Sequence, residues 1–257
     1  MPTKQQMRDE WVAGASNWIE RIRGRGDPSR NHLLDDWMLT AVGDVCDKEV
    51  IDLGCGEGRF CRMLAERGAR MTGIDLSERM IAAASESCVA NETYAANDME
   101  NLRGIADASF DLAVSYITLV DVHDLGRAVA EAFRVLHPGG RFIVCNLAPM
   151  VTAGNRWIRD ADGVKLHYCL DNYLDETTRE MPMCGTKFHN FHRTLSTYIN
   201  TFIRARFVLE EIREPFPSPQ QIEREPSNDD LLRVPLFIIY LLRSHRRYRF
   251  TAGPSTE

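Results

Sequence analysis

Long apolar runs, paired cysteines and an excess of positive charge are all missing from this sequence. No apolar stretch approaches the ~20 residues that span a bilayer. The opening residues Met-Pro-Thr-Lys-Gln-Gln lack the hydrophobic segment of a signal peptide, so we expect a cytoplasmic protein without membrane association. The seven cysteines include no C-x-x-C pair, so the sequence indicates neither a disulfide framework nor a zinc site.

The net charge of −6 argues against nucleic-acid binding, because that affinity depends largely on clustered Lys and Arg. The one basic cluster, residues 243–249, follows the last predicted strand, and we expect it to be a solvated tail. With 257 residues, of which 44% are apolar and 26% charged, the chain has the size and composition of one α/β domain with additions.

The central motif is the segment Glu49–Phe60, where a short apolar strand leads through glycines into a helix. The glycines occupy alternate positions, at Gly54, Gly56 and Gly58. A strand, a glycine turn and a helix N-terminus place free backbone N–H groups at the carboxyl edge of a parallel sheet, where small ligands bind. The third glycine of the dinucleotide fingerprint G-x-G-x-x-G would fall on Arg59, so that pattern fails.

Further motifs follow in a fixed order. Asp52 lies two residues before the first glycine, and a second acid, Asp75, ends the next apolar strand. Beyond them come Asn97-Asp98-Met99, then the stretches 109–115 and 134–142. Together these motifs resemble the class I S-adenosylmethionine-dependent methyltransferases, and among them the small-molecule, UbiE-like methyltransferase type 11 group. The resemblance covers roughly residues 48 to 145.

The resemblance implies an α/β, Rossmann-like sandwich with a seven-stranded, mostly parallel sheet and an antiparallel last strand. The alternation of apolar strands and amphipathic helices from residue 71 to 145 independently favours a parallel sheet. We expect a single methyltransferase domain over residues 1–257. Its parts are N-terminal helices (1–46), a cofactor-binding core (47–147), a substrate cap insertion (148–193), and a C-terminal helix with the last two strands (194–257).

Three regions outside the core carry their own predictions. Apolar residues at helical spacing predict two helices before the first strand, and we interpret Trp11, Trp18 and Trp37 mainly as packing residues, with closure of the cofactor pocket as the alternative. Strand-like stretches predict that the insertion is partly antiparallel. Four prolines between 215 and 226 predict an extended loop rather than a helix.

The resemblance also assigns the S-adenosylmethionine site. It implies that Asp52 orients the glycine turn and favours the methionyl ammonium, that Asp75 accepts from the ribose hydroxyls, and that Asp98 accepts from the adenine amino group. The full set implied to bind the cofactor is Asp52, Gly54, Cys55, Gly56, Asp75, Leu76, Met80, Asp98, Met99, Ser115 and Tyr116. S-adenosyl-L-homocysteine would be the product, and no metal is expected.

Methyl transfer from an activated sulfonium needs mainly a nucleophile held in line, with a general base where the nucleophile must lose a proton. Our candidates for catalytic groups are His192 first, then His189, His123 and Tyr116. After the fourth strand the chain has Ser-Tyr-Ile-Thr where enzymes that methylate base amino groups have Asn/Asp-Pro-Pro-Tyr. We therefore expect an oxygen or nitrogen nucleophile on a small-molecule metabolite.

Two other functions remain open at this level. A non-catalytic S-adenosylmethionine-binding subunit that supports a partner enzyme would share the cofactor residues. A nucleotide-dependent oxidoreductase would share the layered architecture, but the failed third glycine disfavours it. We expect a monomer or homodimer.

Overall fold

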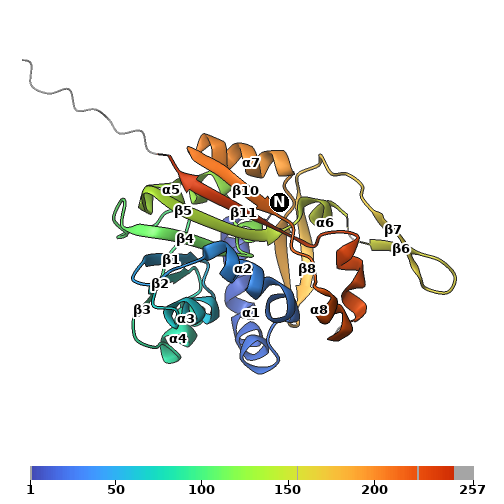
Figure 1. The fold of residues 1–257 in the computed structure, drawn as a ribbon, viewed down its shortest axis with the longest axis horizontal. Helices are drawn as coiled ribbons and strands as arrows, with labels where there is room; N and C mark the ends of the chain where they lie inside the picture. The colour runs from blue at the N-terminus through green and yellow to red at the C-terminus, as the bar shows by residue number, and fades with distance from the viewer. Residues whose placement is uncertain (1, 155, 225, 246–257) are drawn as a thin grey trace, which may run out of the picture.

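The computed structural model describes residues 2–154, 156–224 and 226–245. At its centre is a seven-stranded sheet with the order β10-β11-β5-β4-β1-β2-β3 (Figure 1). The last strand, β11, is antiparallel to both of its neighbours, and the remaining pairs are parallel, which confirms the predicted fold. The strands are β1 (Glu49–Leu53), β2 (Arg70–Asp75), β3 (Glu92–Ala96), β4 (Phe110–Tyr116), β5 (Leu136–Leu147), β10 (Phe207–Arg213) and β11 (Phe237–Ser244).

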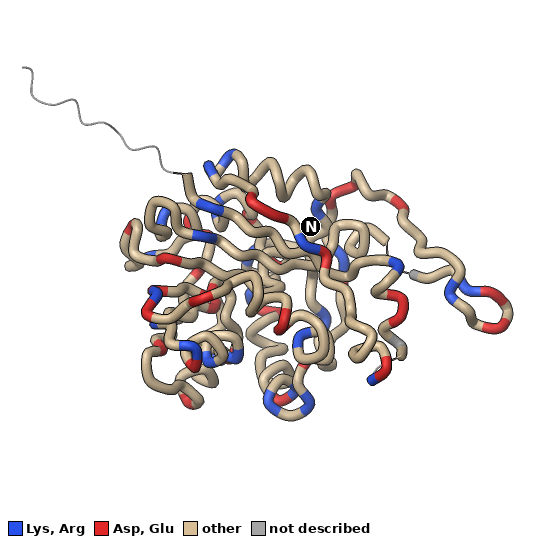
Figure 2. Tube along the Cα trace, viewed as in Figure 1, with Lys and Arg blue, Asp and Glu red and all other residues tan. Residues whose placement is uncertain are grey.

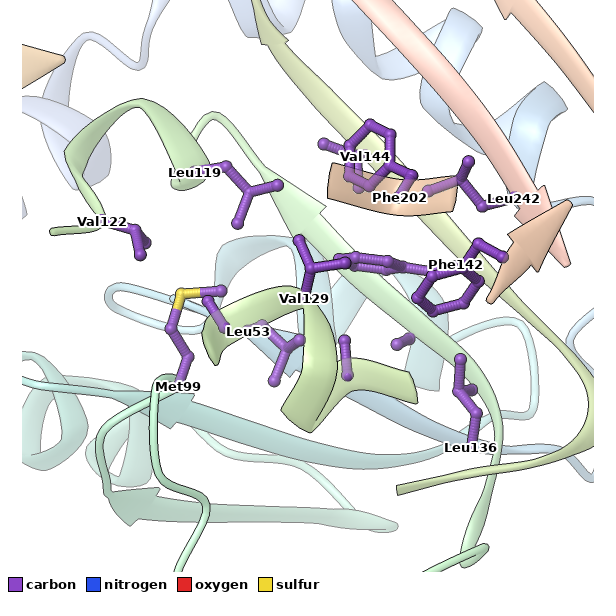
Figure 3. Packing of buried hydrophobic residues seen from close by; sticks show 14 of the residues in the cluster. Leu53, Met99, Leu119, Val122, Val129, Leu136, Phe142, Val144, Phe202 and Leu242 are labelled. Atoms are coloured by element: carbon purple, nitrogen blue, oxygen red, sulfur yellow. The ribbon is translucent and has the colours of Figure 1, made fainter. Parts of the chain in front are cut away.

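Helices cover both faces of this sheet because successive residues of a buried strand point to opposite sides. On one face, Ile51, Val144 and their neighbours pack with α5 (Leu125–Val135) and α7 (Leu195–Arg204), the cluster shown in Figure 3. On the other face, the intervening residues pack with α2 (Asp35–Val42) and α3 (Arg59–Ala65). The core is therefore a three-layer sandwich.

The N-terminal helix α1 (Lys4–Gly24) lies beside α4 (Glu78–Glu86). It starts with a capping box in which Thr3 accepts from the Gln6 backbone and Gln6 bonds back. A π-turn, η1 (Arg30–Leu34), then leads into α2. The two helices that precede the first strand are thus confirmed. Among the described residues, no helix combines the length and apolar character needed to cross a bilayer.

The insertion after β5 starts with α6 (Pro149–Ala153) and continues as two hairpins. The first hairpin projects from the body of the molecule, and the second packs against α1, where the Trp11 and Phe188 ring centroids are 4.4 Å apart (Figure 1). The predicted antiparallel character is confirmed. The hairpin strands are β6 (Arg156–Arg159), β7 (Lys165–Cys169), β8 (Thr178–Met183) and β9 (Thr186–Phe191).

The prediction of an extended loop between β10 and β11 is wrong. This connection contains α8 (Pro219–Arg224) and the 3-10 helix η3 (Pro226–Leu232). Ser218 and Gln221 bond reciprocally, with Gln221 N donating to Ser218 Oγ (3.3 Å) and Ser218 N to Gln221 Oε1 (2.7 Å). Proline is tolerated in the first turn of a helix because that N–H needs no intrahelical partner, so Pro219 and Pro226 begin helices here.

Candidate active site

A cavity of about 170 Å³ lies at the carboxyl edge of the parallel strands. One wall is α1, and the others are the turns that follow β1, β2, β3 and β4, which include the 3-10 turn η2 (Leu119–Asp121). Each turn leaves the same edge of the sheet, which is where open α/β folds bind ligands. The cavity therefore occupies the place that the glycine motif predicts.

The first two glycines of the turn have different surroundings. Gly54 has φ +84°, and a Cβ there would lie 2.2 Å from Thr118 Cγ2. Gly56 has φ +56°, and a Cβ there would have only Trp18 Nε1 within reach, at 4.0 Å. The first glycine thus permits tight packing at the end of β1, whereas the second leaves open space for a ligand.

Asp52 lies under this turn and is only 1% exposed. Its Oδ2 accepts a bond from Cys61 Sγ at 3.5 Å, while its Oδ1 has no hydrogen-bond partner among the described residues. Burial raises the pKa of Asp52 to about 7, and the nearby Asp75 carboxylate adds to the shift. A buried oxygen without a partner suits a cationic or N–H donor ligand.

Asp75 ends β2 and connects two neighbouring turns. Its Oδ2 accepts from Gly56 N at 3.0 Å and its Oδ1 from Ser77 N at 2.9 Å. Burial raises the pKa of Asp75, although these backbone bonds oppose the shift. Each carboxylate oxygen can accept a second bond, so Asp75 retains the capacity to bind a pair of hydroxyls. Leu76 and the buried Met80 line the wall beside it.

Asp98 faces the cavity from the turn after β3, and Lys4 of α1 reaches it from above. Lys4 Nζ lies 2.5 Å from Asp98 Oδ2 and 2.5 Å from Glu100 Oε2. Met99, which is 8% exposed, completes this part of the wall. The start of α1 is therefore attached by ion pairs to the turn after β3.

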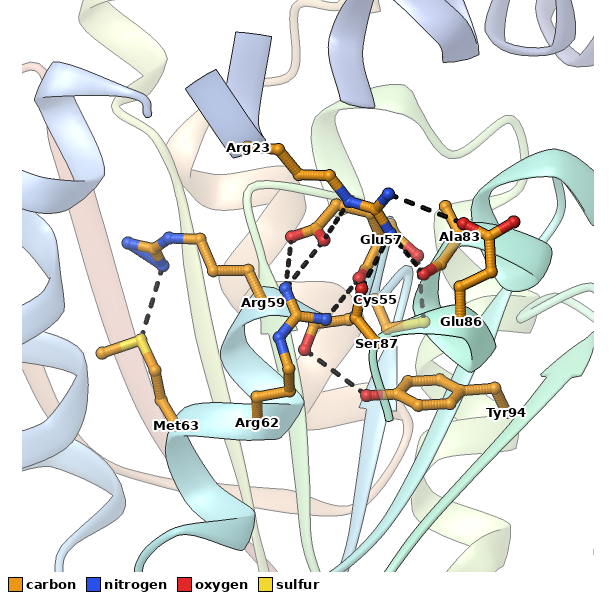
Figure 4. Close-up of polar contacts among 12 residues, drawn as sticks. Arg23, Cys55, Glu57, Arg59, Arg62, Met63, Ala83, Glu86, Ser87 and Tyr94 are labelled. Carbon is orange, nitrogen blue, oxygen red and sulfur yellow. Dashed lines mark hydrogen bonds and ion pairs between the residues drawn. The ribbon is translucent and has the colours of Figure 1, made fainter. Parts of the chain in front are cut away.

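The end of α1 is attached to the glycine turn (Figure 4). Glu57 is 2% exposed and bonds Arg62 Nη2 through both carboxylate oxygens, at 2.9 and 2.7 Å. Arg23 of α1 lies 3.7 Å from the same carboxylate and donates to the Ala83 carbonyl of α4 at 2.6 Å. Attached at both ends, α1 forms a roof over the cavity.

Comparison with known proteins decides the family. A model described as a methyltransferase domain matches residues 51–144. A crystal structure of an S-adenosylmethionine-dependent methyltransferase from Mesorhizobium loti superposes with a TM-score of 0.74 at 31% identity, covering 81% of this chain and 96% of that one. The chain belongs to the S-adenosylmethionine-dependent methyltransferases. It is an enzyme of this type, and S-adenosylmethionine is its cofactor.

Curated relatives of this methyltransferase differ in how much of the chain they match. An uncharacterized protein of Haemophilus influenzae is 27% identical over 227 residues, which are 84% of this chain and 89% of that protein. A malonyl-[acyl-carrier protein] O-methyltransferase of Pseudescherichia vulneris is 39% identical over 113 residues, which are 44% of each chain. Less than half of that relative's length is thus matched.

The residues of the methyltransferase fit its cofactor at several points. The unpaired Asp52 Oδ1 suits the methionyl ammonium, and the space at Gly56 admits a ligand close to the backbone. Asp75 and Asp98 follow at the ends of β2 and β3. We call this side of the cavity, residues 52–56, 75–80 and 98–99, the cofactor half.

The opposite side, formed by Trp11, Trp18, Arg30 and residues 116–123, is the acceptor half. The Arg30 guanidinium lies 5.2 Å from the ring centroids of both Trp18 and Tyr116. The Tyr116 hydroxyl donates to Asp35 Oδ1 at 3.1 Å, and burial raises the pKa of Tyr116 well above its usual range. Tyr116 therefore stays protonated. The interpretation of Trp11 and Trp18 as packing residues is incomplete, because both also line the cavity.

The structure brings most of the predicted site residues together and leaves three outside. Ser115, His189 and His192 do not line the cavity. Those on its wall are Asp52, Gly54, Cys55, Gly56, Asp75, Leu76, Met80, Asp98, Met99, Tyr116 and His123.

The placement of Ser115 beside the cofactor is corrected by strand geometry. Successive residues of β4 point to opposite faces, so Ser115 points away from the face that Tyr116 occupies. Ser115 is fully buried, and its Oγ has no hydrogen-bond partner among the described residues. We expect no contact between Ser115 and the sulfonium.

Both cap histidines are engaged away from the cavity. His192 is 1% exposed, and its Nε2 lies 2.8 Å from the Tyr173 carbonyl while Nδ1 lies 2.7 Å from Thr152 Oγ1. Because a carbonyl only accepts, Nε2 donates to Tyr173, while Nδ1 shares a hydrogen bond with the Thr152 hydroxyl, which also donates to the Pro149 carbonyl at 3.1 Å. His189 pairs with Glu10 at 2.6 Å on the outer side of α1. Both ring nitrogens of His192 are therefore occupied, and His189 lies outside the cavity, so neither residue is placed to act on a substrate there.

Sequence reasoning missed several cavity residues, notably Arg30, Thr118 and Asp121. Arg30 and Asp121 come from segments without a recognisable motif, and Thr118 ends the Ser-Tyr-Ile-Thr stretch that was used only to exclude a substrate class. One structural signal marks the turn after β4: Ile117 has φ +58°, an unfavourable conformation for a β-branched residue. Backbone strain of this kind clusters at functional sites, so it draws attention to the four residues that follow.

Proposed function

We propose that this protein methylates an oxygen or nitrogen atom of a small-molecule metabolite. The observation that carries the proposal is the continuity of the two halves in one cavity beneath α1. A roof attached at both ends leaves room for a small acceptor rather than a macromolecular surface. The relative from Pseudescherichia vulneris is named as an O-methyltransferase, which is consistent with an oxygen nucleophile, but its named malonyl acceptor offers a carboxylate and therefore does not support a hydroxyl over a carboxylate.

The bound cofactor supplies an activated methyl group on a sulfonium. In our proposal, Asp52 holds the methionyl ammonium, Asp75 the ribose and Asp98 the adenine amino group, while Leu76, Met80 and Met99 pack the base. The residues of the acceptor half then hold the nucleophile in line and exclude water, which together lower the barrier. Positioning is the main task of the chain.

The four predicted catalytic candidates differ in their access to this cavity. His192 and His189 are held elsewhere, and Tyr116 donates its hydroxyl to Asp35. His123 remains on the wall, exposed at its rim, with its ring 5.9 Å from Phe191. We therefore propose no role in proton removal for His192, and a role in lining the entrance for His123.

A methyl-transfer screen tests the proposal. The purified protein is incubated with methyl-labelled S-adenosylmethionine and fractionated metabolite extracts, and label transfer and S-adenosylhomocysteine formation are measured together. We expect label in a low-molecular-weight product, and far less of it with the Asp75→Ala variant when the cofactor is below saturation. Label that appears only in protein or nucleic acid would contradict a small-molecule acceptor.

A further inference from the structure

We propose that Asp121 is the proton acceptor in methyl transfer, and that the acceptor is a hydroxyl or an amine rather than a carboxylate. This inference rests on the proposed function and adds a catalytic residue and a substrate class to it. Asp121 ends η2, five positions after β4, and lines the cavity in its acceptor half.

One carboxylate oxygen of Asp121 is anchored and the other is available. Oδ1 accepts a hydrogen bond from Asn190 Nδ2 of β9, and Asn190 itself is 9% exposed. Within residues 2–154, 156–224 and 226–245, the bond from Asn190 is the one hydrogen bond of this carboxylate, so Oδ2 has no partner there. Because Asn190 belongs to the cap, the insertion fixes the orientation of a carboxylate on the cavity wall.

The turn that carries Asp121 is held rigidly. Arg193, which is 7% exposed, donates to the carbonyls of Leu119 (3.0 Å), Val122 and His123 (3.3 Å). A buried guanidinium that bonds three main-chain oxygens of one short turn fixes its conformation. Precise placement of this kind is what a proton acceptor needs and what a solvated surface acid lacks.

The remaining acids on the cavity wall either belong to the cofactor half or form ion pairs. Three aspartates belong to the cofactor half, Glu57 is paired with Arg62 and Arg23, and Glu100 is paired with Lys4. Asp121 is thus the carboxylate of the acceptor half among the described residues.

The surroundings of Asp121 also suit proton transfer near neutral pH. Burial raises the pKa of Asp121 to about 7. The bond from Asn190 and the charges of Arg30 and Arg193 oppose this shift, and the charge of Glu10 on α1 adds to it. A base is most effective when its pKa lies near the working pH.

The proton balance of the reaction then names the acceptor class. A bond forms between the acceptor heteroatom and the methyl carbon, the methyl–sulfur bond breaks, and the electron pair stays on sulfur. The proton of the heteroatom moves to Asp121 Oδ2 and later leaves to solvent. A carboxylate acceptor has no such proton, and its charge would repel an ionised Asp121.

Kinetics of the isosteric variant Asp121→Asn test this role. We expect kcat to fall by about 10²- to 10⁴-fold, the range of general-base contributions, while the affinity for S-adenosylhomocysteine changes less than about twofold. The acidic limb near pH 7 in the wild-type kcat profile should disappear. The matched control is Asp124→Asn, three residues on, where Asp124 caps α5 and Asn caps equally well. Its kcat should equal that of the wild type.

A second readout needs no acceptor. Since the folded pKa of Asp121, about 7, exceeds the ordinary aspartate value of 3.8, the contribution of Asp121 to stability is greatest at acid pH and is lost as the pH rises through 7. Asp121→Asn cannot ionise. Its Tm relative to the wild type should therefore increase by roughly 2 °C or more between about pH 5.5 and pH 8. The other raised carboxyl groups are common to both proteins and cancel in the difference.

The outcomes separate the two proposals. A kcat of Asp121→Asn within about threefold of the wild type, a retained acidic limb, or a Tm difference that is constant with pH would each overturn the role of Asp121. Methylation of carboxylates alone would overturn the substrate class. A wild type that binds S-adenosylhomocysteine but methylates no small molecule would contradict the proposed function, while the Tm comparison would still report on the ionisation of Asp121.

Discussion

The two halves of the cavity are built in different ways. The cofactor half comes from one contiguous part of the chain, residues 52–99, in which short motifs end successive parallel strands. The acceptor half combines α1, η1 and the turn after β4, with support from β9 of the cap. The first half depends on local backbone geometry and the second on packing between distant segments. A scaffold of this kind can keep its cofactor and change its substrate.

The largest effect on cofactor binding should come from Asp75→Ala, which breaks the cofactor half alone. Two ribose hydroxyls would lose a charged acceptor, at a cost of about 2–3 kcal/mol in binding, or roughly 30- to 150-fold in affinity. Calorimetry with S-adenosylhomocysteine measures it. The control is Asp36→Ala, an exposed acid on α2 outside the cavity. Unchanged affinity in a folded Asp75→Ala protein would remove Asp75 from the cofactor site.

The pH dependence of cofactor affinity tests the role of Asp52 in the cofactor half. The pKa of Asp52 is about 7 without ligand, and an ammonium group beside it favours the ionised form. Binding should therefore release a proton, and affinity for S-adenosylhomocysteine should rise about tenfold between pH ~6 and ~8. Asp52→Asn should bind more weakly with a flat profile. A flat wild-type profile would show that Asp52 does not meet the ammonium.

The acceptor half should respond to Trp11→Ala. Trp11 lies between the cavity and the cap, and its ring centroid is 6.1 Å from that of Trp18 and 4.4 Å from that of Phe188. Loss of these ring contacts should raise the acceptor KM about 3- to 10-fold, since each aromatic pair is worth about 0.5–1.5 kcal/mol. Affinity for S-adenosylhomocysteine should stay within about twofold. Trp37→Ala is the control, because Trp37 packs on Phe216 away from the cavity and should leave KM unchanged.

The smallest effect should come from Cys55→Ser in the glycine turn. Burial raises the pKa of the Cys55 thiol well above its usual value, so the residue stays neutral and acts as a small spacer. Affinity for S-adenosylhomocysteine should change less than about threefold, equivalent to less than ~0.7 kcal/mol. Cys55→Leu is the contrasting variant, because Cys55 packs against Gly73 and added bulk should abolish binding. Equal losses in both variants would give the thiol a direct role.

The contiguous half of the site could be predicted from sequence, because its motifs act locally. Asp52, the alternating glycines and Asp75 fix the ends of β1 and β2, and strand alternation fixes the sheet. The antiparallel direction of β11 was implied by the family resemblance and not by the alternation.

The rest depended on tertiary contacts that carry no local signal. The sequence of η2 does not show that Asp121 meets Asn190, 69 residues away. His192 was the first catalytic candidate, yet its partners Thr152 and Tyr173 come from elsewhere in the insertion and hold it away from the cavity. The proline content of the segment that begins at Ser218 predicted a loop. The reciprocal hydrogen bonds between Ser218 and Gln221 start α8 in spite of that composition.

The separation of the two halves is tested most directly by comparing two single variants, one in each half, and measuring both cofactor affinity and turnover for each of them. Asp75→Ala should lose about 30- to 150-fold in affinity for S-adenosylhomocysteine. Asp121→Asn should bind it like the wild type but turn over about 10²- to 10⁴-fold more slowly at saturating cofactor. If Asp121→Asn instead lost cofactor affinity as strongly as Asp75→Ala, the two halves would be one site and the account would be contradicted.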